Sequence, residues 1–140
     1  MYGELLQQVL SLTRACESLY APVVVGSLPG DDSIAAYISA GAPVQQHLDR
    51  GSVNELYITV KSRHSSHETA LNALSDIHTR LTRLKTYPGG EGWQILDIAT
   101  GTAPHYIDPQ DSETPETPAG GSQQLYVSSL KITFYIKGVD

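Results

Sequence analysis

Residues 53–84 read VNELYITVKSRHSSHETALNALSDIHTRLTRL, and this stretch decides the fold. Over residues 53–63 apolar and polar side chains alternate, and a period of two predicts a β-strand. One face holds Leu56, Ile58 and Val60, and the other holds Glu55, Tyr57, Thr59 and Lys61. This alternation is typical of an antiparallel sheet that is covered on one side only.

Directly after this strand, apolar residues recur at spacings of three and four, which predicts an amphipathic helix. Ser65 and Glu68 have the spacing of a capping box, so we expect Ser65 to cap the helix and the helix to end near Lys85. Arg80, Arg83 and Lys85 suit the negative C-terminal end of the helix dipole. The apolar stripe of this helix is expected to pack on the covered face of the strand.

Upstream, the sequence predicts one more helix and two strands. Residues 4–20 carry apolar side chains at helical spacing, and a proline two residues later ends that helix. Residues 22–27 contain three consecutive valines and predict a short buried strand. Residues 33–39 alternate and predict a second strand, whereas residues 41–51, which contain glycine and proline, predict an irregular segment.

Downstream, residues 93–103 predict a long strand in which either alternate set of side chains could form the buried face. Residues 125–137 predict a last strand, with Leu130, Ile132, Phe134 and Ile136 as its apolar face. The intervening residues 108–124 contain acids, prolines and a glycine pair but no large apolar side chain. Burial cannot offset their ordering entropy, so we expect a flexible loop. The two flanking strands most simply pair as a long hairpin.

Together these elements predict an α+β fold, with a mainly antiparallel β-sheet and two helices packed on one face. A long hairpin carries the acidic flexible loop. Residues 1–140 are expected to form a single domain, because 140 residues lie within the usual size of one domain.

Composition narrows the function classes. The chain has 9 basic and 15 acidic side chains and a formal net charge of −6 with histidine neutral, which argues against a general nucleic-acid binder. The single cysteine, Cys16, excludes an internal disulfide and a multi-cysteine zinc site. No apolar run reaches the roughly 18 residues of a membrane span, and we expect neither a secretory signal nor a membrane partner.

Motifs that carry chemistry are few, and we expect no enzymatic activity, no catalytic residues, no metal site and no cofactor. His64 and His67 are three residues apart but straddle the start of the predicted helix, so they need not share a face. The glycine-rich residues 89–92 follow a helix, whereas a phosphate-binding loop opens one. Cys16 lies on the apolar stripe of the first predicted helix, so we expect an inaccessible core residue.

Tyrosines on the sheet suggest an interaction surface. The outer face is expected to carry Tyr57, Tyr126 and Tyr135. Tyrosine is enriched in interfaces because it combines a large contact area with a polar tip, although strands also tolerate it well. These three residues are therefore a candidate subunit interface, with ordinary strand composition as the alternative.

Residues 56–84 resemble the central strand and helix of the tail terminator proteins of long-tailed bacteriophages (siphophages). In that family, a strand with the pattern x-V-x-V-[KR]-[SG] leads into a helix with spaced alanine, isoleucine and leucine. Residues 93–100 and 130–136 are similar to the following and closing strands. The first predicted helix and residues 22–26 resemble the start of the sub-group labelled minor capsid or tail-completion proteins. The acidic, proline-rich insertion departs from the family pattern.

The resemblance implies a structural virion protein that is soluble in the host cytoplasm before assembly. Members of the family form a hexameric ring on the last ring of the tail tube, which stops tube polymerisation. The implied partners are further copies of the chain, the tail tube protein and a head–tail connector or stopper protein, with DNA passing through the lumen without specific binding. Asp108, Asp111, Glu113 and Glu116 would lie at an interface or face the lumen, where like charge discourages adhesion of phosphates.

Other classes stay open at this stage. One is another head–tail connector completion protein with the same small α+β architecture. Another is a non-viral module that binds a small ligand between its helices and its sheet. An enzyme that uses the scattered histidines and acids has the least support.

Overall fold

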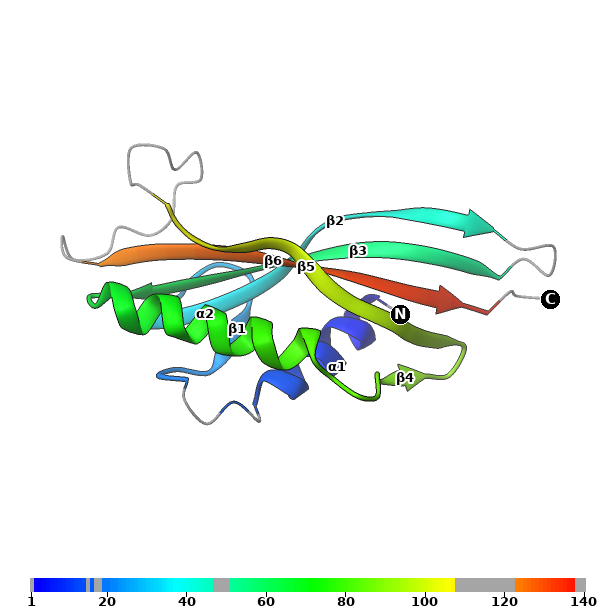
Figure 1. Ribbon diagram of the computed structural model, residues 1–140, viewed down its shortest axis with the longest axis horizontal. Helices are drawn as coiled ribbons and strands as arrows, with labels where there is room; N and C mark the ends of the chain where they lie inside the picture. The colour runs from blue at the N-terminus through cyan, green and yellow to red at the C-terminus, as the bar shows by residue number, and fades with distance from the viewer. Residues whose placement is uncertain (1, 15, 17–18, 47–50, 108–122, 138–140) are drawn as a thin grey trace.

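The computed structural model describes residues 2–14, 16, 19–46, 51–107 and 123–137. Within these ranges the chain forms two helices and a six-stranded sheet with strand order β1-β2-β3-β6-β5-β4. The elements are α1 (Tyr2–Thr13), β1 (Val23–Val25), β2 (Ser33–Gln46), β3 (Ser52–His64), α2 (His67–Thr82), β4 (Gly89–Gly90), β5 (Trp93–Ile107) and β6 (Gln124–Ile136). Figure 1 shows both helices on one side of the long strands. The expected α+β fold is therefore confirmed.

The strand and helix that decide the fold form as expected, with small shifts at the helix ends. β3 buries its expected apolar face. The N-cap of α2 is Ser66 and not Ser65, because the His64 ring accepts the Ser66 N–H at 3.0 Å and so turns the chain one residue later. The helix ends at Thr82 and does not reach Lys85.

α1 is shorter than the predicted helix over residues 4–20. It ends at Thr13, where the chain turns and the Cys16 N–H bonds to the Thr13 carbonyl at 3.0 Å. Leu19 and Tyr20 pack against the core from outside the helix. The apolar spacing that extends to Tyr20 thus reflects burial against one core and not a continuous helix.

The next two strands also depart from the prediction. β1 forms within residues 22–27, but it is an edge strand and not a buried one, since Val25 is 52% exposed. β2 continues to Gln46 through residues expected to be irregular. One-residue register shifts between Ile38 and Ala40 and between Pro43 and Gln45 keep β2 paired with β3.

The last two strands pair as the expected antiparallel hairpin. β5 buries Trp93, Ile95 and Ile98, because a register shift after Ile95 changes which alternate set faces the core. β6 buries Leu130, Ile132 and Phe134, as expected. Of the predicted loop over residues 108–124, Gln124 belongs to β6, and residues 108–122 lie outside the described residues.

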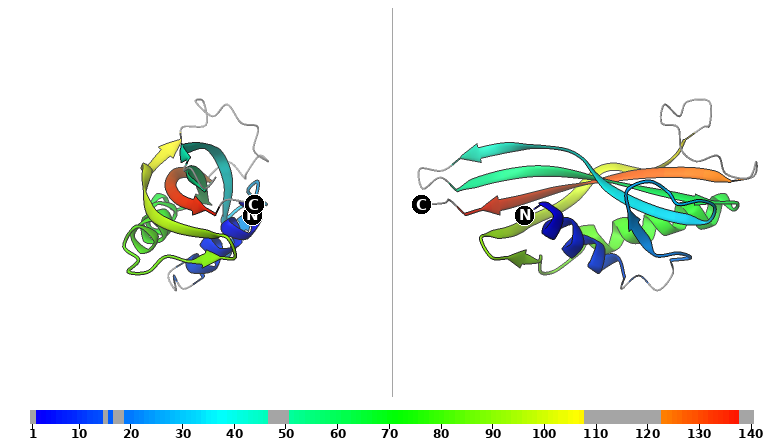
Figure 2. Two further views of the ribbon diagram at one scale, coloured as in Figure 1. Left: turned by 90° about the vertical axis from the view of Figure 1, so that its right-hand side faces the viewer. Right: turned by 180° about the vertical axis from the view of Figure 1, so that it is seen from behind.

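One hydrophobic core lies between the helices and the sheet. It joins Leu5 of α1 and Leu74 and Ile77 of α2 to Ile58 and Ile132 of the central strands, each at most 1% exposed. The views in Figure 2 show the sheet twisting strongly along its length, with both helices on the same side. In the part of the chain that the structure describes, the opposite face and the edges of the sheet carry no helix.

We predict that Ile132→Asn lowers the free energy of unfolding by about 4 kcal/mol, because an amide would enter the core without a partner and leave apolar volume unfilled. The matched control is Thr133→Asn, whose side chain lies on the helix-free face and should cost less than about 1 kcal/mol. Urea denaturation of both variants measures the difference. Equal losses would contradict the register of β6.

Candidate assembly surfaces

The helix-free face of the sheet is the first candidate surface. β3 and β6 pair over their whole length without a register shift, and the apolar core residues of both strands carry even numbers. Odd-numbered residues therefore point away from the helices. Tyr57 and Tyr135 lie on this helix-free face, as the sequence predicts.

Both tyrosines are partly buried by their own chain. A Cβ at Gly101 of β5 would lie 3.2 Å from Cδ1 of Tyr57, so this ring reaches across β6. A Cβ at Gly51 would overlap the Tyr135 ring. Each glycine thus makes room for a tyrosine, and only part of each ring is left to contact another chain.

Tyr126 lies on the opposite face, which corrects the prediction. Its even number places it on the helix side of β6, and its hydroxyl bonds to Nδ1 of His67 at 2.9 Å. The rings of His67, Tyr106 and Tyr126 form one aromatic cluster beside the start of α2. The structure therefore brings only two of the three predicted tyrosines to one face. The predicted acidic residues Asp108, Asp111, Glu113 and Glu116 lie outside the described residues.

The helix-free face also carries charged side chains whose burial and pairing the sequence does not predict. Lys61 and Arg63 are only 6% and 5% exposed, although the alternation of β3 places them outside the core. Lys61 Nζ lies 5.5 Å from the centre of the Tyr37 ring, a cation–π geometry. Nζ of Lys131 in β6 lies 4.0 Å from Oε1 of Glu55 in the neighbouring strand β3. Neighbouring strands supply these partners, so the spacing within β3 alone gives no signal for them.

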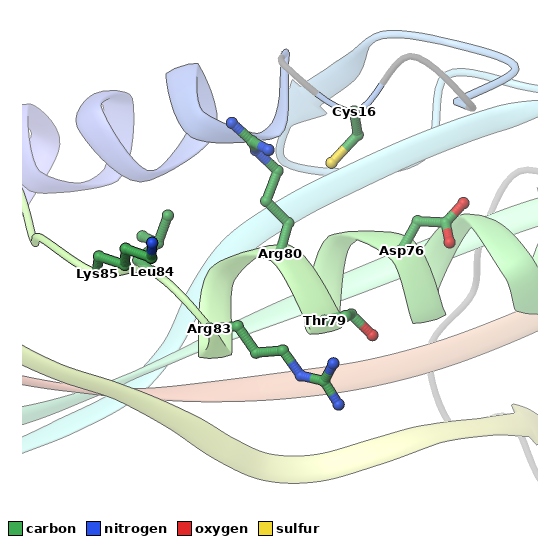
Figure 3. A pocket seen from close by; sticks show the side chains of 7 residues that line it. All are labelled: Cys16, Asp76, Thr79, Arg80, Arg83, Leu84 and Lys85. Carbon is green, nitrogen blue, oxygen red and sulfur yellow. The ribbon is translucent and has the colours of Figure 1, made fainter.

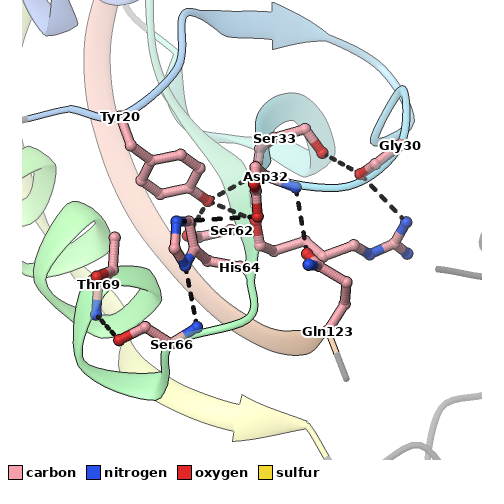
Figure 4. A network of polar contacts seen from close by, with 10 residues as sticks. Tyr20, Gly30, Asp32, Ser33, Ser62, His64, Ser66, Thr69 and Gln123 are labelled. Atoms are coloured by element: carbon pink, nitrogen blue, oxygen red, sulfur yellow. Dashed lines mark hydrogen bonds and ion pairs between the residues drawn. The ribbon is translucent and has the colours of Figure 1, made fainter. Parts of the chain in front are cut away.

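A polar junction joins the segment after α1 to the sheet (Figure 4). The Tyr20 hydroxyl lies 2.8 Å from the Ser33 carbonyl, 2.9 Å from the Arg63 carbonyl and 2.8 Å from Oγ of Ser62. It can donate to only one carbonyl at a time, while Ser62 can donate to it. Burial raises the pKa of the Tyr20 hydroxyl, so it stays protonated near neutral pH.

His64 completes this junction. Its ring lies edge-on to Tyr20 at 4.8 Å between centroids, and its Nε2 lies 3.8 Å from Oδ1 of Asp32. Its Nδ1 already accepts the Ser66 N–H. Tyrosine, histidine and aspartate can serve as acids and bases, but here their polar atoms tie β2, β3 and the start of α2 together. The described residues contain no cluster of three or more metal-ligating side chains.

A shallow groove of about 490 Å³ lies at the C-terminal end of α2 (Figure 3). It is lined by Cys16, Asp76, Thr79, Arg80, Arg83, Leu84 and Lys85. Arg80 extends toward α1, where its Nε donates to the Leu12 carbonyl at 3.3 Å, whereas Arg83 extends to the other side of the helix. The cations therefore do not converge on one point.

Cys16 is partly buried and lines this groove, which corrects the expectation of an inaccessible core residue. Burial raises the pKa of the Cys16 thiol, and the nearby Arg80 only partly opposes this effect. A raised pKa disfavours the thiolate, which is the reactive form. The burial of Cys16 thus works against a role of its thiol as a nucleophile.

His78 connects α2 to β5 inside the helix-covered side. Its Nε2 lies 2.6 Å from Oγ1 of Thr100, and its Nδ1 is buried without a hydrogen-bond partner in the described part of the chain. Burial lowers the pKa of His78, since the charged ring would lose its solvation. The folded protein therefore favours the neutral ring.

Comparison with known proteins points to a fold and not to a named family. No family model matches this chain, and no curated protein matches it. A chain in a solved structure described as the virion of a native gene transfer agent (GTA) particle is similar, with a TM-score of 0.53 and 12% sequence identity. The match covers 94% of this chain and 93% of that chain. At this identity the similarity shows a shared fold over nearly the whole length.

Among the described residues, no helix is long and apolar enough to span a membrane.

We predict that Tyr20→Phe lowers the free energy of unfolding by about 1–2 kcal/mol, because the Ser62 hydroxyl and two carbonyls lose a buried partner. Tyr106→Phe is the matched control, since its hydroxyl makes one exposed bond to Gln124 and its loss should cost about 0.5 kcal/mol or less. Thermal and urea unfolding measure both. No difference between the variants would contradict a structural role of the junction.

We predict that His78 makes the protein less stable in mild acid. Because the pKa of His78 is lowered on folding, the unfolded chain takes up a proton first as the pH falls below about 6.5, the ordinary histidine value. Stability is then lost down to the folded-state pKa. His78→Gln should flatten the dependence of unfolding free energy on pH in this window, whereas His105→Gln, at an exposed position, should leave it in place. Unchanged slopes in both variants would contradict the assignment.

Proposed function

We propose that this protein is a structural component of a phage-like virion and that it acts as a tail terminator. The observation that supports the proposal is the structural similarity over nearly the whole chain to a chain of a GTA virion. The resemblance of residues 56–84 and of the flanking strands to siphophage tail terminators points in the same direction. In this role the protein forms a ring that caps the tail tube, stops its polymerisation and joins the tail to the head connector.

The two-layer fold suits such a role. Among the described residues, both helices cover one face, and the other face and the unpaired parts of both sheet edges could contact neighbours. A closed ring needs heterologous contacts, in which two different surfaces of each copy meet. The proposed partners are further copies, in a hexamer, the tail tube protein and a connector or stopper protein.

The proposed role needs neither catalysis nor a cofactor. Two observations support a structural role for the candidate polar sites: the Tyr20 hydroxyl bonds to the sheet, and burial raises the pKa of the Cys16 thiol, which disfavours its reactive thiolate. DNA would pass the ring without specific binding, and the formal charge of −6 discourages adhesion of phosphates. The protein would be soluble before assembly and part of the virion afterwards.

The test is electron microscopy of particles produced by the host of this gene, with the gene deleted and then restored in trans. We expect unjoined heads and free tails of uncontrolled length without the protein, and joined particles with it. Unjoined heads with tails of normal length would contradict the terminator role and favour a connector-level completion protein. Intact particles would contradict both roles and favour a small-ligand module, for which the groove at the end of α2 would be the first place to look.

A further inference from the structure

Both outer long strands of the sheet have open edges. β1 pairs only with residues 34–36 of β2. β4 pairs only with Trp93 and Gln94 of β5. The last backbone hydrogen bond along this edge runs from the Ile95 N–H to the Pro88 carbonyl, at 3.1 Å. Beyond these points neither β2 nor β5 has a further neighbouring strand in the described part of the chain.

The two open edges have compatible directions. β2, β3, β6 and β5 are neighbours in that order, and each pair is antiparallel. β2 and β5 therefore run in opposite directions at opposite sides of the sheet. If β5 of one copy lay beside β2 of a rotated copy, the antiparallel alternation would continue from one sheet into the next.

Prolines limit both edges to short stretches. Pro43 in β2 and Pro104 in β5 lack a backbone N–H and so interrupt edge pairing. The remaining open stretches are residues 37–42 and residues 97–102. Their charged side chains are limited to Asp97, and neither stretch contains a lysine of the kind that commonly protects exposed edges.

These two stretches lie at the same height in the sheet. The register runs from Tyr37 through Thr59 and Ser129 to Thr102, and from Ala42 through Glu55 and Thr133 to Asp97. Antiparallel pairing of one stretch with the other would therefore continue this register from one copy into the next. A closed ring also requires that neighbouring copies be related by a rotation without translation along the ring axis, because such a translation would produce an open helical filament.

The hydrogen-bonding phase also matches. On β2, the Ala36 carbonyl points to the open edge, where it accepts the Gly26 N–H at 3.0 Å. Backbone groups alternate in direction along a strand, and counting through the register shift between Ile38 and Ala40 directs the backbone N–H and C=O of Gly41 to the same edge. On β5, the Ile95 N–H points to the edge. Counting through the register shift after Ile95 directs the backbone N–H and C=O of Ile98 to the same edge. The register runs from Gly41 through Leu56 and Ile132 to Ile98, so Gly41 and Ile98 lie at the same height in the sheet.

We propose that residues 97–102 of β5 in one copy pair antiparallel with residues 37–42 of β2 in the next copy. The occupant of each edge is a second copy of this chain, and the pairing joins the sheets into one continuous ring. This inference names the contact by which the ring forms, so it rests on the proposed function. The edge geometry belongs to the chain itself and can be tested separately.

The test is a disulfide between copies. In a Cys16→Ser background, Ala40→Cys and Ala99→Cys place thiols at equal height on the helix-free face, linked by the register through Tyr57 and Lys131. Within one chain β2 and β5 are separated by three inter-strand spacings of about 4.8 Å each, so the two positions are too far apart for a disulfide. The double variant is oxidised in two preparations, as free protein at high concentration and in purified particles. In both, we expect a ladder of disulfide-linked oligomers that ends at one closed species.

Controls separate edge pairing from random oxidation. Each single-cysteine variant should give no ladder, because the two edges that meet are different. Ala40→Cys combined with Ser75→Cys, an exposed position on α2, should also give none. Unfolding under reducing conditions verifies that all variants fold.

The outcomes distinguish this inference from the proposed function. A ladder in solution supports edge pairing even if the protein is absent from particles, a result that would overturn the virion role alone. A protein that is present in particles but yields no ladder there would overturn edge pairing and leave the virion role intact. A ladder in neither preparation would also overturn edge pairing.

Discussion

The rest of the structure depends on the pairing of β3 with β6. These two central strands align from Ser52 opposite Ile136 to His64 opposite Gln124 without a register shift. Their helix-side faces form the floor of the core on which α2 packs. Because a slip of one residue would turn every side chain to the wrong face, burial on one side fixes this register strongly. The outer strands β2 and β5 can then carry bulges, since each is held in place by a regular neighbour.

Bulges and glycines on the outer strands shape the helix-free face and the edges of the sheet. The shift after Ile95 lets β5 keep burying apolar side chains as it curves around the core. Near the next shift, Gly101 leaves space for the Tyr57 ring to cross β6. Contacts across the helix-free face, of the Tyr57 ring with Gly101 and of Lys61 with Tyr37, accompany the reduced exposure of these side chains outside the core.

The sequence predicts those parts of the fold in which one periodicity persists, and it misleads where that periodicity is interrupted. Residues 56–60 of β3, helix α2 and residues 130–134 of β6 keep a period of 2 or 3.6, so their buried faces are predictable. β5 changes phase at its bulge, and β2 runs through glycine and proline that usually end strands. The prediction for Tyr126 is wrong, because its even number in β6 places it on the helix side, where it contacts His67. The burial of Lys61 and the junction at Tyr20 arise from contacts between distant segments, for which local spacing carries no signal.

The prolines at the two edges bear on how copies of the proposed ring component would stay separate before they assemble. An open strand edge pairs with almost any other edge, so a fully open edge would invite aggregation. Pro43 and Pro104 leave two short stretches at one height, and six residues of main-chain pairing form a weak contact between two free copies. In a closed ring every copy gains both of its edge contacts, and a surface below the ring that aligns the copies would lower the entropy cost of closure. Weak edges in matched register would therefore let the ring form on a template at a lower protein concentration than in solution.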